Sequence, residues 1–135
     1  QAADAGLVHT VANHRDGLSY ICNCCTCSCG ILRGIAEARL ANVVARSAYQ
    51  AVVAEEDCVG CGVCEAACQF GAIQVFETAE INQNTCVGCG VCVRACPEEV
   101  ITLNQRPEED TLKIPNAFHD WLAARRDSRQ LTADA

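Results

Sequence analysis

The chain has 135 residues, 13 of them cysteine, and a formal net charge of −7. Cysteine makes up close to a tenth of the chain, so the cysteines must be explained before any other feature. The negative charge argues against a nucleic-acid-binding protein, because contacts to phosphate need basic residues. No run of about eighteen apolar residues is present, so we expect no membrane-spanning helix.

The chain begins at Gln1 and contains no methionine. We therefore expect either a trimmed chain or a piece of a longer polypeptide. No secretory signal is visible. Closely spaced, repeated cysteine pairs favour metal binding over disulfides, and metal-binding thiolates are kept in a reducing compartment. The sequence thus favours the cytoplasm.

Residues 1–48 are expected to form a helical segment that carries extra cysteines. We predict a short Ala-rich helix near the start, a turn at residues 13–17 and an extended stretch at 18–21. His9 and His14 lie ahead of the cysteines and are interpreted as capping or surface imidazoles rather than as metal ligands.

Five cysteines are crowded into residues 22–29. Disulfides between cysteines this close are strained for most pairs, whereas four thiolates from one curled loop can surround a metal. We predict a third four-iron cluster here, with zinc and redox-labile thiols as alternatives. Spacing does not identify the fifth, non-ligating cysteine, although the adjacent Cys24 and Cys25 are the favoured candidates. The set is Cys22, Cys24, Cys25, Cys27 and Cys29.

A long helix is predicted over residues 31–48, because apolar and small residues recur on one stripe at helical spacing. We expect this helix to hold the cysteine loop at a fixed distance from the rest of the chain. The stripe consists of Leu32, Ala36, Leu40, Val43 and Ser47.

Residues 58–96 contain two copies of the pattern C-x2-C-x2-C-x3-C, offset by 28 residues. Ten of nineteen aligned positions are identical between the copies. The surrounding pattern predicts strands at 49–54, 73–76, 80–82 and 100–104, and short helices at 63–68 and 91–95. So short a segment buries too little apolar surface to be stable alone, and metal bonds would replace the missing core.

These eight cysteines resemble the ligands of bacterial-type ferredoxins with two [4Fe-4S] clusters. The resemblance implies an α+β, pseudo-two-fold dicluster module over residues 49–104, with flanking N- and C-terminal helices. In that family the first three cysteines of one run share a cluster with the fourth cysteine of the other. The implied ligands are Cys58, Cys61, Cys64 and Cys96 for the first cluster, and Cys86, Cys89, Cys92 and Cys68 for the second.

One position departs from that family. Gln69 follows Cys68 where the family usually has proline, whereas Pro97 follows Cys96 as expected. The two clusters therefore need not share a reduction potential. We expect amide groups near the glycines of the two ligand runs to hydrogen-bond the cluster sulfurs and tune those potentials.

The stretch at residues 20–27, of the form Y-x-C-N-C-C-x-C, resembles the cysteine-rich lead-in of certain multi-cluster electron-transfer proteins. That group has a further cysteine at the position of Ser28, so the resemblance implies that this residue is not needed as a ligand.

Residues 105–135 are predicted to form a polar linker and a docking helix that starts near Pro115. Phe118, Trp121, Leu122 and Arg125 would share one face of that helix. We favour packing of this face within the chain over contact of Trp121 with a partner.

The sequence as a whole predicts an electron-transfer protein or subunit rather than an enzyme in its own right. It carries no dinucleotide-binding or phosphate-binding motif and no nucleophile–base pattern. Single electrons would pass through two or three [4Fe-4S] clusters to a partner oxidoreductase with a basic docking patch. The alternatives are a redox or metal sensor with a labile cluster or zinc in the N-terminal loop, and an unusual loop cluster that binds a substrate.

Overall fold

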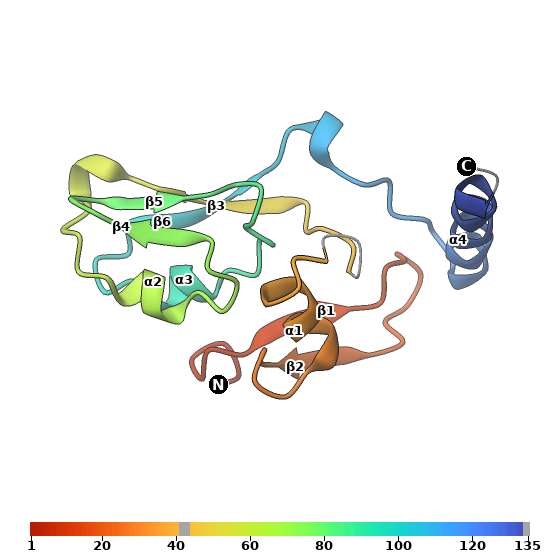
Figure 1. Ribbon diagram of the computed structural model, residues 1–135, viewed down its shortest axis with the longest axis horizontal. Coiled ribbons are helices and arrows are strands. Elements are labelled where there is room, and N and C mark those ends of the chain that lie inside the picture. The colour runs from red at the N-terminus through yellow and green to blue at the C-terminus, as the bar shows by residue number, and fades with distance from the viewer. Residues whose placement is uncertain (41–43, 134–135) are drawn as a thin grey trace.

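The computed structural model describes residues 1–40 and 44–133. It is an α+β structure in which short helices accompany three two-stranded antiparallel sheets in the described part of the chain. Figure 1 shows a compact part built from residues near 50–105, an N-terminal part beside its helices, and a C-terminal helix at the far end of an extended segment.

Two of the sheets enclose the cysteine repeat. Strand β3 (Tyr49–Val53) pairs with β6 (Ile101–Gln105), which joins the start of the repeat to its end. Strand β4 (Ile73–Val75) pairs with β5 (Ala79–Ile81) between the two cysteine runs. These strands confirm the sequence-based predictions to within a residue or two.

A short helix lies within each cysteine run. Helix α2 (Val63–Ala67) and helix α3 (Val91–Ala95) start at the predicted residues, and both lie on one side of the strands (Figure 1). The 3-10 helix η1 (Glu55–Asp57) leads into the first run. Each α-helix is followed directly by a fourth cysteine, so the helix carries that cysteine away from the other three of its own run.

The core of this part is small and consists partly of cysteines. Its buried aliphatic residues are Ala51, Ala72, Ile73, Ala79 and Ile101, and these pack with the buried Cys64, Cys86 and Cys92. A core of this size stabilises a fold only weakly. Bonds from the cysteines to a metal centre would therefore contribute stability that the aliphatic residues do not supply.

The predicted N-terminal helix is wrong. Strand β1 (Val8–Val11) instead pairs antiparallel with β2 (Ile21–Cys24), and the connection contains bends at residues 13–17, where a turn was expected. The β-branched residues Val8, Thr10 and Val11 favour the strand. Val8 is buried and the next residue, His9, is exposed, as alternation along a strand requires.

The predicted helix over residues 31–48 is also wrong. Helix α1 (Gly30–Ala36) has only seven residues. Arg39 adopts a positive φ of 54°, the left-handed conformation that commonly follows a helix C-terminus, and the amide of Leu40 donates to the carbonyl of Gly34 at 3.1 Å. Leu40 is 53% exposed, so the expected stripe does not continue, and Val43 lies outside the described residues.

The C-terminal segment contains the 3-10 helix η2 (Glu108–Asp110) and helix α4 (Phe118–Ala133). The amides of Arg15 and Asp16 donate to the carbonyl of Asn116 at 3.0 and 2.7 Å. The ring of His14 contacts the edge of Phe118, with 5.9 Å between the ring centroids. The start of α4 is therefore held by the N-terminal loop, which agrees with the preference for packing within the chain.

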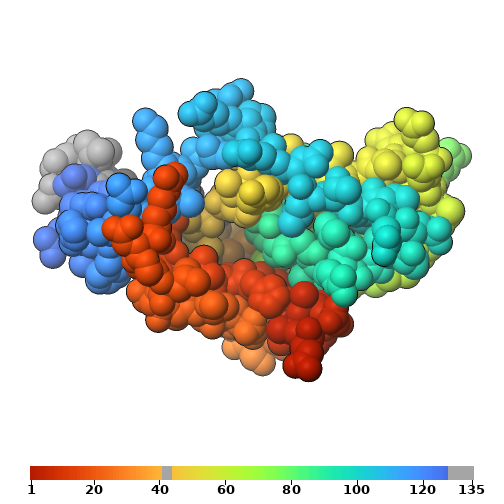
Figure 2. Space-filling model, turned by 180° about the vertical axis from the view of Figure 1, so that it is seen from behind, coloured from red at the N-terminus to blue at the C-terminus, as the bar shows by residue number. Residues whose placement is uncertain are grey.

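Side chains on the predicted face of α4 partly contact one another. Phe118 stacks on Trp121, and the guanidinium of Arg125 lies 5.1 Å from the centre of the Trp121 ring. Phe118 nevertheless remains exposed. Figure 2 shows the N-terminal residues along one edge of the molecule, between the cysteine repeat and the C-terminal helix.

Candidate metal centre

The first predicted ligand set lies around one pocket. Cys58, Cys61 and Cys64 reach it from the first ligand loop and α2, and Cys96 reaches it from the residue after α3. The rest of the lining is largely apolar and includes Val75, Ala79, Val100 and Ile101. Four thiols in an apolar pocket are a donor set suited to an iron–sulfur cluster.

The thiols of this set differ in their exposure. Burial raises the pKa of the Cys64 thiol, and the neighbouring Cys61 and Cys58 add to that effect. Cys61, by contrast, is exposed. The first site therefore has one face open to solvent, through Cys61.

The second predicted set is more deeply buried. The pKa of Cys92 is raised to about 12, mainly by burial, with contributions from Cys89, Cys86 and Cys68. The pKa of Cys89 is raised by burial and then by Cys68 and Cys86. Cys68, which belongs to the first run in sequence, thus lies within electrostatic reach of two cysteines of the second run, Cys89 and Cys92.

The residues present fit the cluster that the resemblance implies. Without a metal, the raised pKa values keep Cys64, Cys89 and Cys92 protonated near neutral pH. Iron binding removes those protons, because thiolates are the ligands. A bound [4Fe-4S] cluster would supply one-electron chemistry, and the protein residues hold it, bury it and set its surroundings.

Two backbone amides donate to the sulfurs of the predicted ligands. The amide of Ala72 donates to Sγ of Cys68, and the amide of Ala79 donates to Sγ of Cys58, each at 3.4 Å. Such hydrogen bonds raise the reduction potential of a cluster by stabilising its added charge. Sequence reasoning placed these donors near the glycines and missed both alanines.

Two glycines have a steric role in the ligand loops. Gly60 has a φ of +62°, and a Cβ there would lie 2.5 Å from the carbonyl oxygen of Glu77. Gly88, at the matching place in the second run, has a φ of +74° and would meet the carbonyl of Tyr49. Only glycine permits both the left-handed conformation and the close backbone approach.

Arg106 was not predicted as part of the site. Its side chain is buried and donates from Nη2 to the carbonyl of Cys86 at 2.8 Å and from Nη1 to Gln50 at 3.2 Å. Burial, with repulsion from Arg46, lowers its pKa from 12.5. The guanidinium stays charged at neutral pH, so a buried positive charge lies beside the second ligand set. Its position at the end of β6 gave no signal in the sequence.

The N-terminal cysteine loop contains a disulfide, although its close cysteine spacing was expected to disfavour one. Cys25 and Cys27 form a disulfide, because the turn at Thr26 brings their Cα atoms to 5.2 Å, within the usual range. Cys22, Cys24 and Cys29 are free. The structure thus divides the five predicted ligands into three thiols and one bridged pair.

The three free thiols lie close together. Burial and the neighbouring Cys29 raise the pKa of Cys24, and Cys22 contributes as well. The amides of Leu32 and Ile31, in the first turn of α1, lower the pKa of Cys29. Helix N-termini stabilise thiolates in this way, so Cys29 is the thiol in this group most ready to bind a cation.

Neither histidine of the N-terminal part lies in the cysteine loop. His14 is buried, and its two ring nitrogens interact with the carbonyl of Asp16 and the hydroxyl of Ser19. His9 is exposed and pairs with the side chain of Asn23. His14 is therefore a structural residue of the loop at 13–19, and not a surface imidazole.

Within residues 1–40 and 44–133, no three His, Cys, Asp or Glu side chains converge on the position of a single metal ion. A four-iron cube differs from a single ion because each thiolate binds a separate iron at its own corner. The cysteines of a cube therefore surround a volume instead of meeting at a point.

The fold and the two sets of thiols define an iron–sulfur electron-transfer module of the α+β type. Residues 51–103 match the family model of the 4Fe-4S dicluster domain. This segment is therefore a ferredoxin-like segment that binds [4Fe-4S] clusters and transfers electrons. No curated protein matches the chain. None of the helices in the described part of the chain is long and apolar enough to cross a membrane.

Proposed function

We propose that the chain relays single electrons through three [4Fe-4S] clusters to a partner oxidoreductase. The observation that carries the proposal is the grouping of eight cysteines of the dicluster segment into two sets of four, with the fourth cysteine exchanged between runs. The first cluster is held by Cys58, Cys61, Cys64 and Cys96, and the second by Cys86, Cys89, Cys92 and Cys68. The two halves are then related by a pseudo-two-fold axis.

The third cluster is held by the N-terminal loop. Cys22, Cys24 and Cys29 supply three thiolates, and the fourth comes from Cys25 or Cys27. That ligand exists only when the disulfide between them is reduced. Two electrons and two protons convert the disulfide to two thiols, and a thiol reductant such as glutathione supplies both. The other cysteine of the pair is then the non-ligand.

The proposed organisation has three parts. Residues 1–48 carry the third cluster, residues 49–104 the first two, and residues 105–135 form a linker and a docking helix. The contacts between α4 and the loop at 13–19 support a docking role within the chain.

The partner docks at the end of the molecule that carries the first cluster. Cys61 is exposed there, as are Val59 and Phe76. Residues 47–93 contain no lysine or arginine but six acidic residues. An exposed ligand shortens the path for an electron, and an acidic surface attracts a basic patch on the partner.

Iron analysis of protein reconstituted under anaerobic, thiol-reducing conditions tests this proposal. About twelve irons per chain support three clusters, and about eight support two. No bound iron would overturn the electron-transfer proposal. EPR of the dithionite-reduced protein then separates [4Fe-4S] clusters from other iron.

A further inference from the structure

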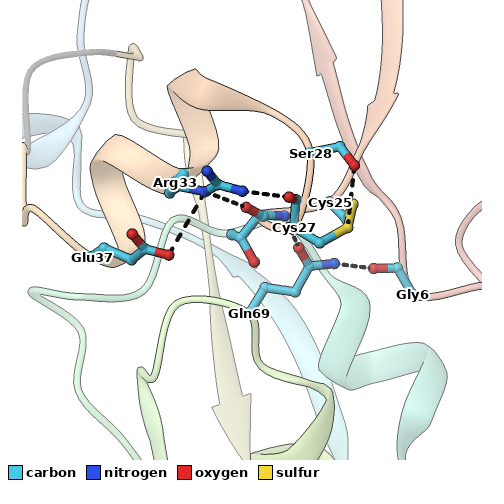
Figure 3. Close-up of a disulfide and its surroundings, with 8 residues drawn as sticks. Gly6, Cys25, Cys27, Ser28, Arg33, Glu37 and Gln69 are labelled. Carbon is cyan, nitrogen blue, oxygen red and sulfur yellow. Dashed lines mark hydrogen bonds and ion pairs between the residues drawn. A yellow bond between two sulfur atoms is a disulfide. The ribbon is translucent and has the colours of Figure 1, made fainter.

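Gln69 joins the N-terminal cysteine loop to the second ligand set. Its side-chain Oε1 accepts the amide of Thr26 at 2.8 Å, and its Nε2 donates to the carbonyl of Gly6. Figure 3 shows Gln69 reaching between Gly6 and the turn of Cys25 and Cys27. Both polar ends of the side chain are thus used, although Gln69 directly follows the predicted ligand Cys68.

The local backbone does not explain the glutamine. Cys68 has φ −77° and ψ 99°, and Cys96 has φ −71° and ψ 116°. Both residues are in the extended region and not in the α region that a following proline disfavours, and each cysteine follows a five-residue helix and precedes a turn. Pro97 occupies the position after Cys96. Since proline suits the same turn, the side-chain contacts are what distinguish Gln69.

The same two parts also share an apolar cluster. Val8 and Leu32 from the N-terminal part pack with Phe70 and Val91 from the ferredoxin-like segment, and all four are buried. Packed against them are cysteines of both parts, namely Cys24, Cys29, Cys68 and Cys89. The cysteine loop is therefore packed against the second ligand set.

Two further contacts lie at the edges of the interface between the N-terminal part and the ferredoxin-like segment. Arg39 donates to the carbonyl of Phe70 at 3.5 Å, and Arg94 of α3 pairs with Asp4 at 2.6 Å. Neither contact involves a residue of the first ligand set. The first site lies with Val59, Val75 and Val100, outside the shared cluster.

We propose that Gln69 is a positioning residue that holds the cysteine loop against the second cluster and thereby sets the order of the relay. With clusters bound, electrons would pass between the one held by the loop and the one held by Cys68, Cys86, Cys89 and Cys92, and would reach the one held by Cys58, Cys61, Cys64 and Cys96 last. The order rests on the proposed third cluster, whereas the positioning contact does not.

Hydrogen exchange tests the contact independently of iron content. In Gln69→Ala and Gln69→Pro, the amide of Thr26 loses its acceptor, and we expect its exchange to accelerate about tenfold or more. Gln74→Ala is the matched control, because Gln74 is exposed on β4 and makes none of these contacts. Proline keeps the turn after Cys68, so this variant should still bind iron at the second set. Equal exchange in all three variants would overturn the positioning role.

EPR of the fully reduced protein tests the order. A reduced neighbour splits or broadens the signal of the loop cluster, and this spin coupling weakens with distance. We expect Cys89→Ser to remove the coupling and Cys61→Ser to preserve it, with circular dichroism checking that both variants are folded. The reverse result, with coupling lost only in Cys61→Ser, would overturn the order.

The possible failures are distinguishable. Eight irons in the wild-type protein would remove the third cluster, and the order with it, while the exchange of Thr26 still reports on Gln69. Twelve irons with unchanged Thr26 exchange would overturn the positioning role alone. Twelve irons with faster exchange in both Gln69 variants, and coupling that depends on Cys89, would support both.

Discussion

The ferredoxin-like segment and the N-terminal cysteine loop place their cysteines in different ways. In the segment, each run places two cysteines in a tight loop, a third in a five-residue helix and a fourth directly after that helix, and the run occurs twice. In the loop, five cysteines lie within eight residues, and their neighbours come from β1, α1 and Gln69. The first arrangement is local and repeated, whereas the second depends on contacts distant in sequence.

This difference implies different consequences of losing a ligand. Cys64, Cys86 and Cys92 belong to the buried core of the segment, together with a few small aliphatic residues. The free cysteines of the loop are only half-buried. Loss of a cluster in the segment should therefore destabilise the segment strongly, whereas loss of the loop cluster should leave the segment largely intact.

Replacing a buried ligand should have the largest effect. We expect Cys92→Ala to lose about four irons and to lower the thermal unfolding temperature of the segment strongly, because metal-binding energy is folding energy in so small a core. Iron content and thermal unfolding followed by circular dichroism measure both effects. A Cys92→Ala protein with full stability would contradict the idea that the clusters replace a hydrophobic core.

The matching change in the loop should leave the segment folded. We expect Cys29→Ala to lower the iron content from about twelve to about eight per chain while the segment unfolds as in the wild type. Cys25→Ala and Cys27→Ala form the control pair, since the proposed third cluster uses only one of these cysteines as a ligand. If both variants retained about twelve irons, either cysteine could serve as the fourth ligand in place of the other.

A comparison of Gly62 and Gly88 separates the cost of a left-handed backbone conformation from the cost of a steric clash. Gly88→Ala adds a Cβ against the carbonyl of Tyr49, whereas Gly62 has a similar φ of +78° and open space around it. We expect Gly62→Ala to cost about 1–2 kcal/mol and Gly88→Ala about 3 kcal/mol or more, because β3 must shift. Urea unfolding of the iron-loaded protein measures both. Equal losses would mean that the close approach to Tyr49 carries no energy.

Arg106 provides a test confined to the second cluster. Arg106→Leu removes the donor to the carbonyl of Cys86, and we expect a loss of about 1–3 kcal/mol of stability. Loss of the buried positive charge should also lower the reduction potential of the second cluster relative to the first. Potentiometric titration followed by EPR resolves the two potentials. A uniform shift of both clusters would argue against a local effect of Arg106.

The smallest effect is expected at the edge of the interface between the two regions. Arg94 and the N-terminal ammonium hold the pKa of Asp4 at about 2, below its usual 3.8. Because the folded-state pKa is lowered, this pair stabilises the protein above about pH 4, and the contribution disappears as the pH falls towards 2. Both side chains are exposed, so Asp4→Asn should barely change stability at neutral pH. A large loss at pH 7 would show that this edge contributes more than an exposed pair should.

The strands and helices of the ferredoxin-like segment were predictable because their signals are local. Each of β3, β4, β5 and β6 has apolar residues at alternate positions, and each short helix starts inside a cysteine run. The N-terminal predictions failed because the decisive interactions are non-local. Alanines near residue 1 favour a helix, but β1 instead pairs with β2, whose paired residues lie ten to sixteen positions further along the chain.

The helix stripe from Leu32 to Ser47 failed for a different reason. Its spacing is consistent with a helix, but α1 ends at Ala36, and Arg39 takes a left-handed conformation. Helix propensity is a weak signal that tertiary contacts override. Leu32 alone of the described stripe residues is fully buried, in the cluster with Phe70.

The sequence by itself determined the iron–sulfur class, the eight cysteines and the short elements that carry them, because cysteine spacing within a loop is a local property. The tertiary structure decided which sulfurs receive hydrogen bonds from Ala72 and Ala79, that Arg106 lies beside the second set, and that Gln69 holds the cysteine loop. These contacts join residues far apart in the chain, so no pattern along the sequence specifies them. A glutamine in place of a proline signalled a departure from the family, and only the folded chain brought Thr26 and Gly6 within its reach.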